Sequence, residues 1–209
     1  KEKLAKHLKK IGFSQTDQNY YNIELLSAEP FVQFGFEDQI VTAQLVGSYN
    51  FTNCAIAVLM GKHFNIAKSD ITAAIAAYQP SNNRSQLVQK SGHEILLDAY
   101  NANPTSMKAA LESFQKTRGR HKILFLGDMF ELGNEAEKEH QQIANLAKNL
   151  RFENVYLVGE NFFKTKTDYQ KYKSFEGLKK YLERASLSES SILIKGSRGM
   201  ALERILEIL

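Results

Sequence analysis

The chain has 209 residues, of which 43% are hydrophobic and 24% are charged, so it is long and apolar enough for one or two globular domains. With three prolines and twelve glycines it is neither collagen-like nor of low complexity, and no apolar run is long enough to cross a membrane. The net charge of +4 is weak evidence for nucleic acid, and the single cysteine, Cys54, cannot form an internal disulfide. We therefore expect a cytoplasmic protein without nucleic acid as a partner.

The first ten residues, KEKLAKHLKK, have helical spacing, with Leu4 and Leu8 on one face. They lack the apolar centre and the cleavage site of a secretion signal. The segment from Phe31 to Val46 is rich in Val, Ile and Phe, and its apolar and polar residues partly alternate, which predicts two strands.

Two alanine-rich helices are predicted next, at residues 51–64 and 69–78, the second beginning with Ser69 or Asp70 as its cap. The two strands and two helices of residues 1–81 face no obvious complete core. We interpret this segment as the end of another domain.

A breaker cluster, Pro80-Ser-Asn-Asn83, predicts a domain boundary. After it, short aliphatic strands alternate with helical segments. The strands are expected at 95–98, 122–126, 154–158 and 191–194, and the helices near 104–118, 136–150, 175–186 and 199–208. This rhythm is typical of a mostly parallel sheet with helices on both faces, so residues 82–209 are predicted to form a Rossmann-like α/β domain.

In open parallel sheets, ligands bind outside the carboxyl ends of the strands, so the turns there are the first candidates for a site. In the turn DAYNAN, Pro104 suits the first helical position, which makes Asn103 a helix cap. Asp98 has no evident local backbone role and could accept hydrogen bonds from the two hydroxyls of a ribose, which favours ligand contact over a structural bond. Tyr100 and Asn101 are compatible with either role.

Two later turns carry charge. GDMFELG presents Asp128 and Glu131, a pair that could bind a metal or an ammonium group, although most such pairs are solvated. KGSRG offers Lys195 and Arg198 with the backbone N–H groups around Ser197, a receptor for a carboxylate or phosphate. A surface role for this second turn is equally open.

Upstream, Asn50 and Asn53 lie three residues apart at a predicted helix start. They could cap the helix or together read the edge of an adenine. Arg84 could reach a phosphate or lie on the surface. The histidines show no spacing that suggests zinc.

Taken in order, five segments of this sequence resemble the Mur ligases, and most closely those of the MurF type. The segments are GSYNFTNCAIAV, NNRSQ, DAYNANPTSMKAAL, LGDMFELG with His140 following, and KGSRGMALERIL. The resemblance implies three domains, one for a UDP-sugar, a central ATPase domain and a Rossmann-like third domain. It also implies a reaction in which ATP phosphorylates a peptide carboxylate and the amine of D-alanyl-D-alanine attacks the acyl phosphate, releasing ADP and phosphate.

The resemblance also implies residue roles. For ATP it assigns Asn50 and Asn53 to the adenine, Arg84 to the phosphates and Asp98 to the ribose. Tyr100 and Asn101, which follow Asp98 in the same turn, are further candidates for this nucleotide site. For D-alanyl-D-alanine it implies Asp128, Glu131, Lys195, Ser197 and Arg198. One departure is Tyr49, where the family usually has histidine.

The sequence contains no G-x-x-x-x-G-K-[ST] motif; the nearest text, Gly61-Lys62, is followed by His63. We therefore expect residues 1–81 to be the tail of the central ATPase domain and 82–209 the whole third domain of a MurF-like ligase. The phosphate-binding loop, the Mg²⁺ ligands and the domain for UDP-N-acetylmuramoyl-tripeptide are then expected upstream, and the chain alone is predicted to be inactive.

Other enzyme and signalling classes fit less well. A dinucleotide-dependent dehydrogenase needs a glycine fingerprint after its first strand, which Asp98-Ala-Tyr100 is not. A receiver-like domain needs an acidic pair after its first strand, and that order fails. A non-catalytic nucleotide-binding or interaction module remains the alternative.

Overall fold

The computed structural model describes residues 11–119 and 121–209, so the predicted helix with Leu4 and Leu8 lies outside the described residues. The chain divides into two compact units between Tyr78 and Gln79. This division falls just before the Pro80 cluster. The assignment of the first unit to a central ATPase domain stays a prediction.

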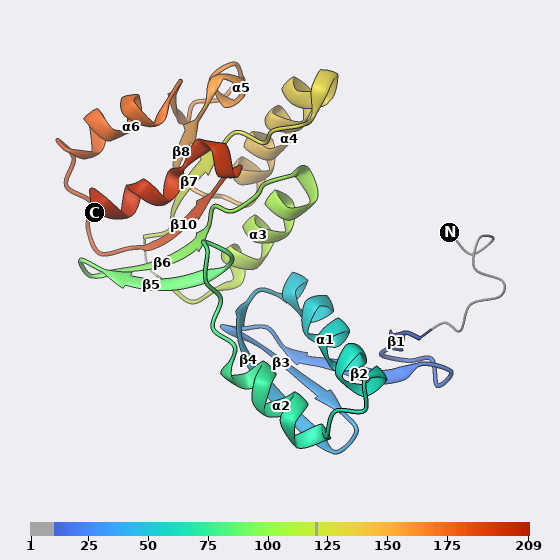
Figure 1. The fold of residues 1–209 in the computed structure, drawn as a ribbon. Helices are drawn as coiled ribbons and strands as arrows, with labels where there is room; N and C mark the ends of the chain where they lie inside the picture. Colours follow the sequence, from blue (N-terminus) through green and yellow to red (C-terminus); the bar gives the residue numbers. More distant parts are fainter. Residues whose placement is uncertain (1–10, 120) are drawn as a thin grey trace. The chain divides into compact units, whose positions relative to one another are not determined.

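The described part of the first unit contains a four-stranded sheet, in the order β1-β2-β3-β4 (Figure 1). Its strands are β1 (Phe13–Ser14), β2 (Tyr21–Ser27), β3 (Phe31–Phe36) and β4 (Gln39–Val46). The last two are the strands predicted from the Val, Ile and Phe content. The prediction missed β2, in which only Ile23 is fully buried, so that its sequence carries little alternation.

Two helices follow this sheet, α1 (Phe51–His63) and α2 (Lys68–Ala77), and a 3₁₀ turn, η2 (Ser48–Asn50), precedes α1. The predicted cap of the second helix is wrong, because α2 begins at Lys68 with Ala67 at its cap position. Asp70 lies instead in the first turn of α2, where the negative charge of its carboxylate interacts favourably with the positive end of the helix dipole.

Contrary to the expectation from sequence, the first unit has a core of its own. The core joins one face of the sheet to the helices through Ile23, Val32, Phe34, Phe36, Val41, Phe51, Cys54, Val58 and Ile71. Burial raises the pKa of the Cys54 thiol to about 11. The additional strand β2 contributes Ile23 to this core, in which the apolar residues of β3, β4 and the two helices are buried.

The second unit is built on a six-stranded sheet, in the order β5-β6-β10-β7-β8-β9 among the described residues. The strands are β5 (Gln86–Lys90), β6 (His93–Asp98), β7 (Ile123–Gly127), β8 (Asn154–Val158), β9 (Gln170–Tyr172) and β10 (Ser191–Lys195). All neighbours pair in parallel except β5 with β6, which are antiparallel. The predicted mostly parallel α/β fold is confirmed.

Helices cover both faces of this sheet (Figure 1). They are α3 (Pro104–Lys116), α4 (Ala136–Asn149), α5 (Glu160–Phe163) and α6 (Phe175–Leu182), with the 3₁₀ segments η3 (Gly133–Glu135), η4 (Arg198–Met200) and η5 (Leu202–Glu207). In Figure 1, α3 and α4 lie on one face, and α6 with the C-terminal segment lies on the other.

Alternation along the strands divides the buried residues between the two faces. Ile95, Leu97, Phe125 and Ile194 belong to one cluster with Leu178 of α6 and Ile205 of η5. Their buried neighbours along the strands point the other way, toward α3 and α4, because side chains alternate with a period of two.

The single helix predicted near 199–208 is wrong. Ala201 adopts a left-handed conformation, with φ of 47°, and separates η4 from η5. The residues Leu202 and Ile205 are both fully buried, and their spacing of three matches the period of a 3₁₀ helix. Packing onto the sheet therefore decides the conformation of this last segment.

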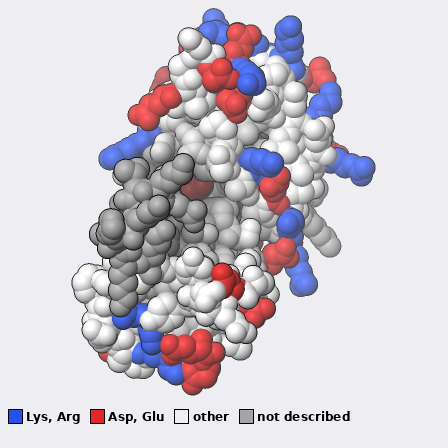
Figure 2. All heavy atoms as spheres, turned by 90° about the vertical axis from the view of Figure 1, so that its right-hand side faces the viewer, with Lys and Arg blue, Asp and Glu red and all other residues white. Residues whose placement is uncertain are grey.

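No helix in the described part of the chain is both long and apolar enough to cross a membrane. On the face shown in Figure 2, the basic and acidic side chains of the described residues are interspersed.

Candidate functional site

The carboxyl ends of β6, β10 and β7 lie side by side, and the turns after them enclose a hollow of about 360 Å³, here called the strand-end pocket. It is lined by Asn101, Ala102 and Asn103 after β6, Phe130, Glu131 and Leu132 after β7, and Ser197, Arg198 and Gly199 after β10. The sheet order brings together three turns that are distant in sequence. This is the location predicted for a ligand in an open parallel sheet.

Asp98, at the end of β6, has two protein partners. The Lys195 ammonium donates to Asp98 Oδ2 at 2.5 Å, and the N–H of Ser85 donates to Asp98 Oδ1 at 3.1 Å. The expectation that Asp98 has no local structural role is therefore wrong. Its side chain is still 13% exposed, whereas that of Lys195 is 2% exposed.

Lys195 also donates to the carbonyl of Asn101 at 3.3 Å, so this buried cation ties the end of β10 to the turn after β6. Lys195 does not line the strand-end pocket, whereas Arg198 does. Of the two cations that the resemblance implies for the dipeptide, Arg198 is thus the one that lines this pocket.

The predicted cap of α3 is confirmed. Asn103 Oδ1 accepts from the N–H of Ser106 at 2.8 Å, and the hydroxyl of Ser106 accepts from the N–H of Asn103 at 3.1 Å, with Pro104 in the first helical turn. Asn101 is exposed, and its side-chain oxygen accepts from the N–H of Ala102 at 2.9 Å. Asn103 thus caps α3 and also lines the pocket, whereas Asn101 lines the pocket without capping the helix.

Tyr100 brings two of the candidate arginines together. The guanidinium carbon of Arg84 lies 3.7 Å from the centre of the Tyr100 ring, and that of Arg198 lies 5.4 Å from it. Both distances allow cation–π attraction. Two guanidinium groups around one ring create a positive region beside the pocket, suited to a carboxylate or a phosphate.

Asp128, after β7, is turned into the protein and is 3% exposed. Its carboxylate accepts from the N–H groups of Asn161 and Phe162, both at 2.9 Å, at the start of α5. At Gly159, with φ of 127°, a Cβ would lie 2.2 Å from the Asp128 carboxyl carbon, so only glycine permits this approach.

The two acids predicted to meet the dipeptide amine are therefore separated. The carboxylate of Asp128 serves protein N–H groups, and Asp128 is not among the pocket-lining residues. Glu131 is exposed and lines the strand-end pocket, in a left-handed conformation with φ of 64°. The geometry favours Glu131 as the acid that a ligand would meet.

Ser197 lines the pocket but is 3% exposed. Its N–H donates to the carbonyl of Asp128 at 3.1 Å, and its hydroxyl accepts from the N–H of Phe130 at 2.9 Å. The idea that this N–H receives a ligand carboxylate is wrong, because it already has a protein acceptor. Ser197 instead joins the turn after β10 to the turn after β7.

Asn50 and Asn53 belong to the first unit. The side-chain amide of Asn50 donates to the carbonyl of Val46 at 2.8 Å, and that of Asn53 donates to Asn50 Oδ1 at 3.0 Å. Asn50 makes no side-chain cap of α1, so that alternative is wrong for it. The two amides do share one side of the helix start, as their spacing predicts.

Sequence reasoning missed the apolar part of the lining. The ring of Phe130 lies against Gly199, where an added Cβ would be 2.7 Å from it, and Phe130 is 45% exposed. The sequence did contain a sign of this role, because Phe130 and Leu132 are apolar residues in the acidic turn that follows β7. The pocket thus combines an acid, a cation and an aromatic wall.

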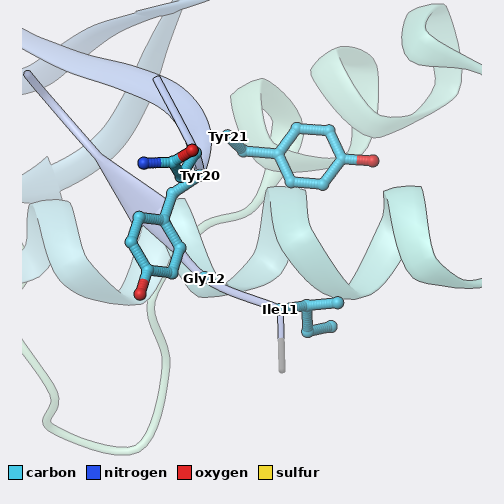
Figure 3. Close-up of a pocket in the computed structure, with 5 residues that line it drawn as sticks. Ile11, Gly12, Tyr20 and Tyr21 are labelled. Atoms are coloured by element: carbon cyan, nitrogen blue, oxygen red, sulfur yellow. The ribbon is translucent and has the colours of Figure 1, made fainter. Parts of the chain in front are cut away.

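A second hollow of about 250 Å³ lies in the first unit (Figure 3). Ile11, Gly12, Asn19, Tyr20 and Tyr21 line it, and the rings of Tyr20 and Tyr21 point in different directions. Among the described residues that line it there is no carboxylate, lysine, arginine or histidine, and none of the residues predicted for a site. Among residues 11–119 and 121–209, no group of three or more His, Cys, Asp or Glu side chains is placed to hold a metal.

Comparison with known proteins identifies relatives. Residues 83–198 match the family model described as Mur ligase, glutamate ligase domain. The UDP-N-acetylmuramoyl-tripeptide–D-alanyl-D-alanine ligase of Bacillus subtilis is 33% identical over 78% of this chain, and the match covers 38% of that protein. The chain thus spans well under half of this relative's length.

Solved structures agree on the fold. A crystal structure of MurF from Acinetobacter baumannii superposes with a TM-score of 0.77 and 25% identity, over 94% of this chain and 46% of that one. MurF ligase from Thermotoga maritima, solved in complex with ADP, shares the fold with a TM-score of 0.72 at 20% identity, over 94% of this chain and 47% of that one. Since the family match covers more than half of its residues, this chain belongs to the Mur ligase family.

Proposed function

We propose that this chain is the C-terminal part of an ATP-dependent amide ligase that joins D-alanyl-D-alanine to UDP-N-acetylmuramoyl-tripeptide in peptidoglycan synthesis. The names of the relatives support the reaction, and the strand-end pocket supports the dipeptide. The observation that carries the proposal is the pairing of one acid and one cation, Glu131 and Arg198, in the lining of a single pocket.

A dipeptide needs complementary groups for its two ends. The guanidinium of Arg198 suits the carboxylate of D-alanyl-D-alanine, because arginine can form two parallel hydrogen bonds to it. Glu131 suits the amine, which it would hold by a charge-assisted hydrogen bond. Phe130 offers apolar surface to the small methyl groups. Holding both ends would orient the amine for attack on the activated peptide carboxylate.

The nucleotide roles remain proposals for each unit separately. In the second unit, Asp98 is partly exposed and retains free lone pairs for ribose hydroxyls, and Arg84 with Tyr100 and Asn101 provides a cationic and polar surface for phosphates. In the first unit, the linked amides of Asn50 and Asn53 suit an adenine edge. The Thermotoga maritima MurF ligase was solved with ADP bound, which supports a nucleotide of this class.

ATP would supply the phosphoryl group that turns the peptide carboxylate into an acyl phosphate, with Mg²⁺ as the expected counter-ion. The chain's own groups, in this proposal, bind and orient rather than exchange protons. Catalysis by a fragment with these groups alone is not expected, since the transferred phosphoryl group needs positioned charge on several sides.

The test uses the full-length polypeptide that contains this chain. We expect phosphate release from ATP only when both UDP-N-acetylmuramoyl-tripeptide and D-alanyl-D-alanine are present, with one phosphate for each dipeptide incorporated. Nucleotide binding without turnover under these conditions would favour the non-catalytic module. ATP hydrolysis that ignores the dipeptide would contradict the proposed substrate.

A further inference from the structure

His140, in α4, is completely buried and uses both of its ring nitrogens. Its Nδ1 lies 2.6 Å from the carbonyl of Ala136, and its Nε2 accepts from the N–H of Met129 at 2.9 Å. A carbonyl can only accept and a backbone N–H can only donate. The ring therefore carries its proton on Nδ1 and a lone pair on Nε2, which is the neutral form.

The bond to Met129 is one of three that hold consecutive residues of the turn after β7. The carbonyl of Asp128 accepts from Ser197 N–H, Met129 donates to His140, and the N–H of Phe130 donates to Ser197 Oγ. The next residue, Glu131, has φ of 64°, a conformation that costs energy for a residue with a side chain. Such a conformation persists where the flanking backbone is held firmly, as these bonds hold it.

The side chain of His140 is closely packed, and the N–H of Met129 has little access to another acceptor. The edge-to-face contact with Phe162 places the ring centres 4.6 Å apart, and Nε2 lies 3.5 Å from Asp128 Oδ1. Met129 is itself 1% exposed, so water has little access to replace a lost acceptor for its N–H. An unsatisfied buried N–H is costly, and the turn would shift to relieve it.

We propose that His140 is a positioning residue, which holds the turn after β7 in the shape that presents Glu131 and Phe130 to the strand-end pocket. It acts through the N–H of Met129 and does not touch the ligand. The inference rests on the proposed function, because it names the part of the dipeptide site that depends on a residue of α4. A purely structural histidine would support folding without a selective effect on dipeptide binding.

Two conservative variants separate these roles. In His140→Gln, the longer amide can place an acceptor oxygen near the position of Nε2 and preserve the bond from Met129. In His140→Asn, the shorter amide can replace only Nδ1, preserving the bond to Ala136 and losing the bond from Met129. Both variants remove the ring, so the loss of its packing against Phe162 is common to them.

Steady-state kinetics of the full-length enzyme gives the readout. For His140→Asn we expect the KM for D-alanyl-D-alanine to rise about tenfold, equivalent to about 1.4 kcal/mol, while the KM for ATP changes by less than about twofold. For His140→Gln we expect both constants within about threefold of wild type. Equal effects of the two variants, or equal effects on both substrates, would overturn the proposal.

A measurement on the wild-type 209-residue chain keeps the inference testable if the variants fold poorly. Selective ¹⁵N labelling of histidine should show His140 neutral, with its proton on Nδ1, and ¹⁵N labelling of methionine should show a long-lived, exchange-protected Met129 N–H. A proton on Nε2 would overturn the inference by itself. Absence of any turnover with D-alanyl-D-alanine in wild type would instead contradict the proposed function and leave this geometric result standing.

Discussion

Two turns of the second unit begin alike, with an aspartate directly after a buried strand, yet the two carboxylates do different work. Asp98, after β6, stays partly exposed and pairs with the ammonium of Lys195. Asp128, after β7, is buried and accepts from two N–H groups at the start of α5. Asp98 thus lies next to a turn that lines the strand-end pocket, whereas Asp128 connects the turn after β7 to the start of α5.

The difference arises from the neighbours that the sheet supplies. Lys195 is 97 residues from Asp98 in sequence, and the N–H groups that Asp128 caps are 33 and 34 residues away. A strand-end acid takes the nearest donor, which is a buried cation in one turn and a helix start in the other. The role of such an acid thus depends on which strand lies next to its own, and not on its own sequence context.

The largest effect is expected for Asp98→Ala. It leaves the Lys195 ammonium buried without its counter-charge, which should lower the free energy of unfolding by about 4 kcal/mol. Urea denaturation of the 209-residue chain measures this loss. The double variant Asp98→Ala with Lys195→Met should recover most of the stability, since no uncompensated charge remains. Unchanged stability of Asp98→Ala, with a KM for ATP raised by about one to two orders of magnitude, would show a role in nucleotide binding alone.

Asp128→Ala should come next, with a loss of about 3 kcal/mol, because two N–H groups at the start of α5 lose their charged acceptor. Asp128→Asn retains one side-chain oxygen and should lose about half as much. The same denaturation experiment compares them. If Asp128→Ala were as stable as wild type but bound D-alanyl-D-alanine poorly, the contrast between the two aspartates would be wrong.

Gly159→Ala tests the buried position of the Asp128 carboxylate by changing the residue that it packs against. The new Cβ would overlap the Asp128 carboxylate, and the residue would also have φ of 127°, so we expect a loss of about 2 kcal/mol or more. Gly133→Ala is the matched control, because Gly133 also has positive φ, at 51°, but open space around it. Its cost should be about 1 kcal/mol, from the left-handed backbone alone. Equal melting temperatures of the two variants would argue against a tight approach at Gly159.

The smallest effect concerns the pocket itself. In the full-length enzyme, Arg198→Ala should raise the KM for D-alanyl-D-alanine about tenfold and leave the KM for ATP nearly unchanged. Arg204→Ala is the control, since Arg204 stacks on Phe175 and pairs with Glu176 without lining the strand-end pocket. Parallel changes in both substrates, or similar behaviour of the two variants, would remove Arg198 from the dipeptide site.

The elements that the sequence predicts well are those whose pattern reflects complete burial. The strand at residues 154–158 has the predicted bounds, and α3 and α4 lie within their predicted ranges. Elements at sheet edges, such as β5 and β9, were missed because exposed and half-buried side chains weaken the apolar pattern. The C-terminal segment failed for a different reason, since contacts with the sheet overrode its helical composition.

For the site, the sequence alone determined which chemical groups stand at the strand ends, because strand and helix patterns are local and show where each strand stops. It also sufficed for the cap at Asn103, whose partners lie within three residues. Only the tertiary structure decided the partner of each charged group. Inserting β10 between β6 and β7 places Lys195 beside Asp98 and Ser197 beside Asp128 and Phe130. These contacts join residues 67 and 97 positions apart, and no local pattern records which strand becomes the neighbour.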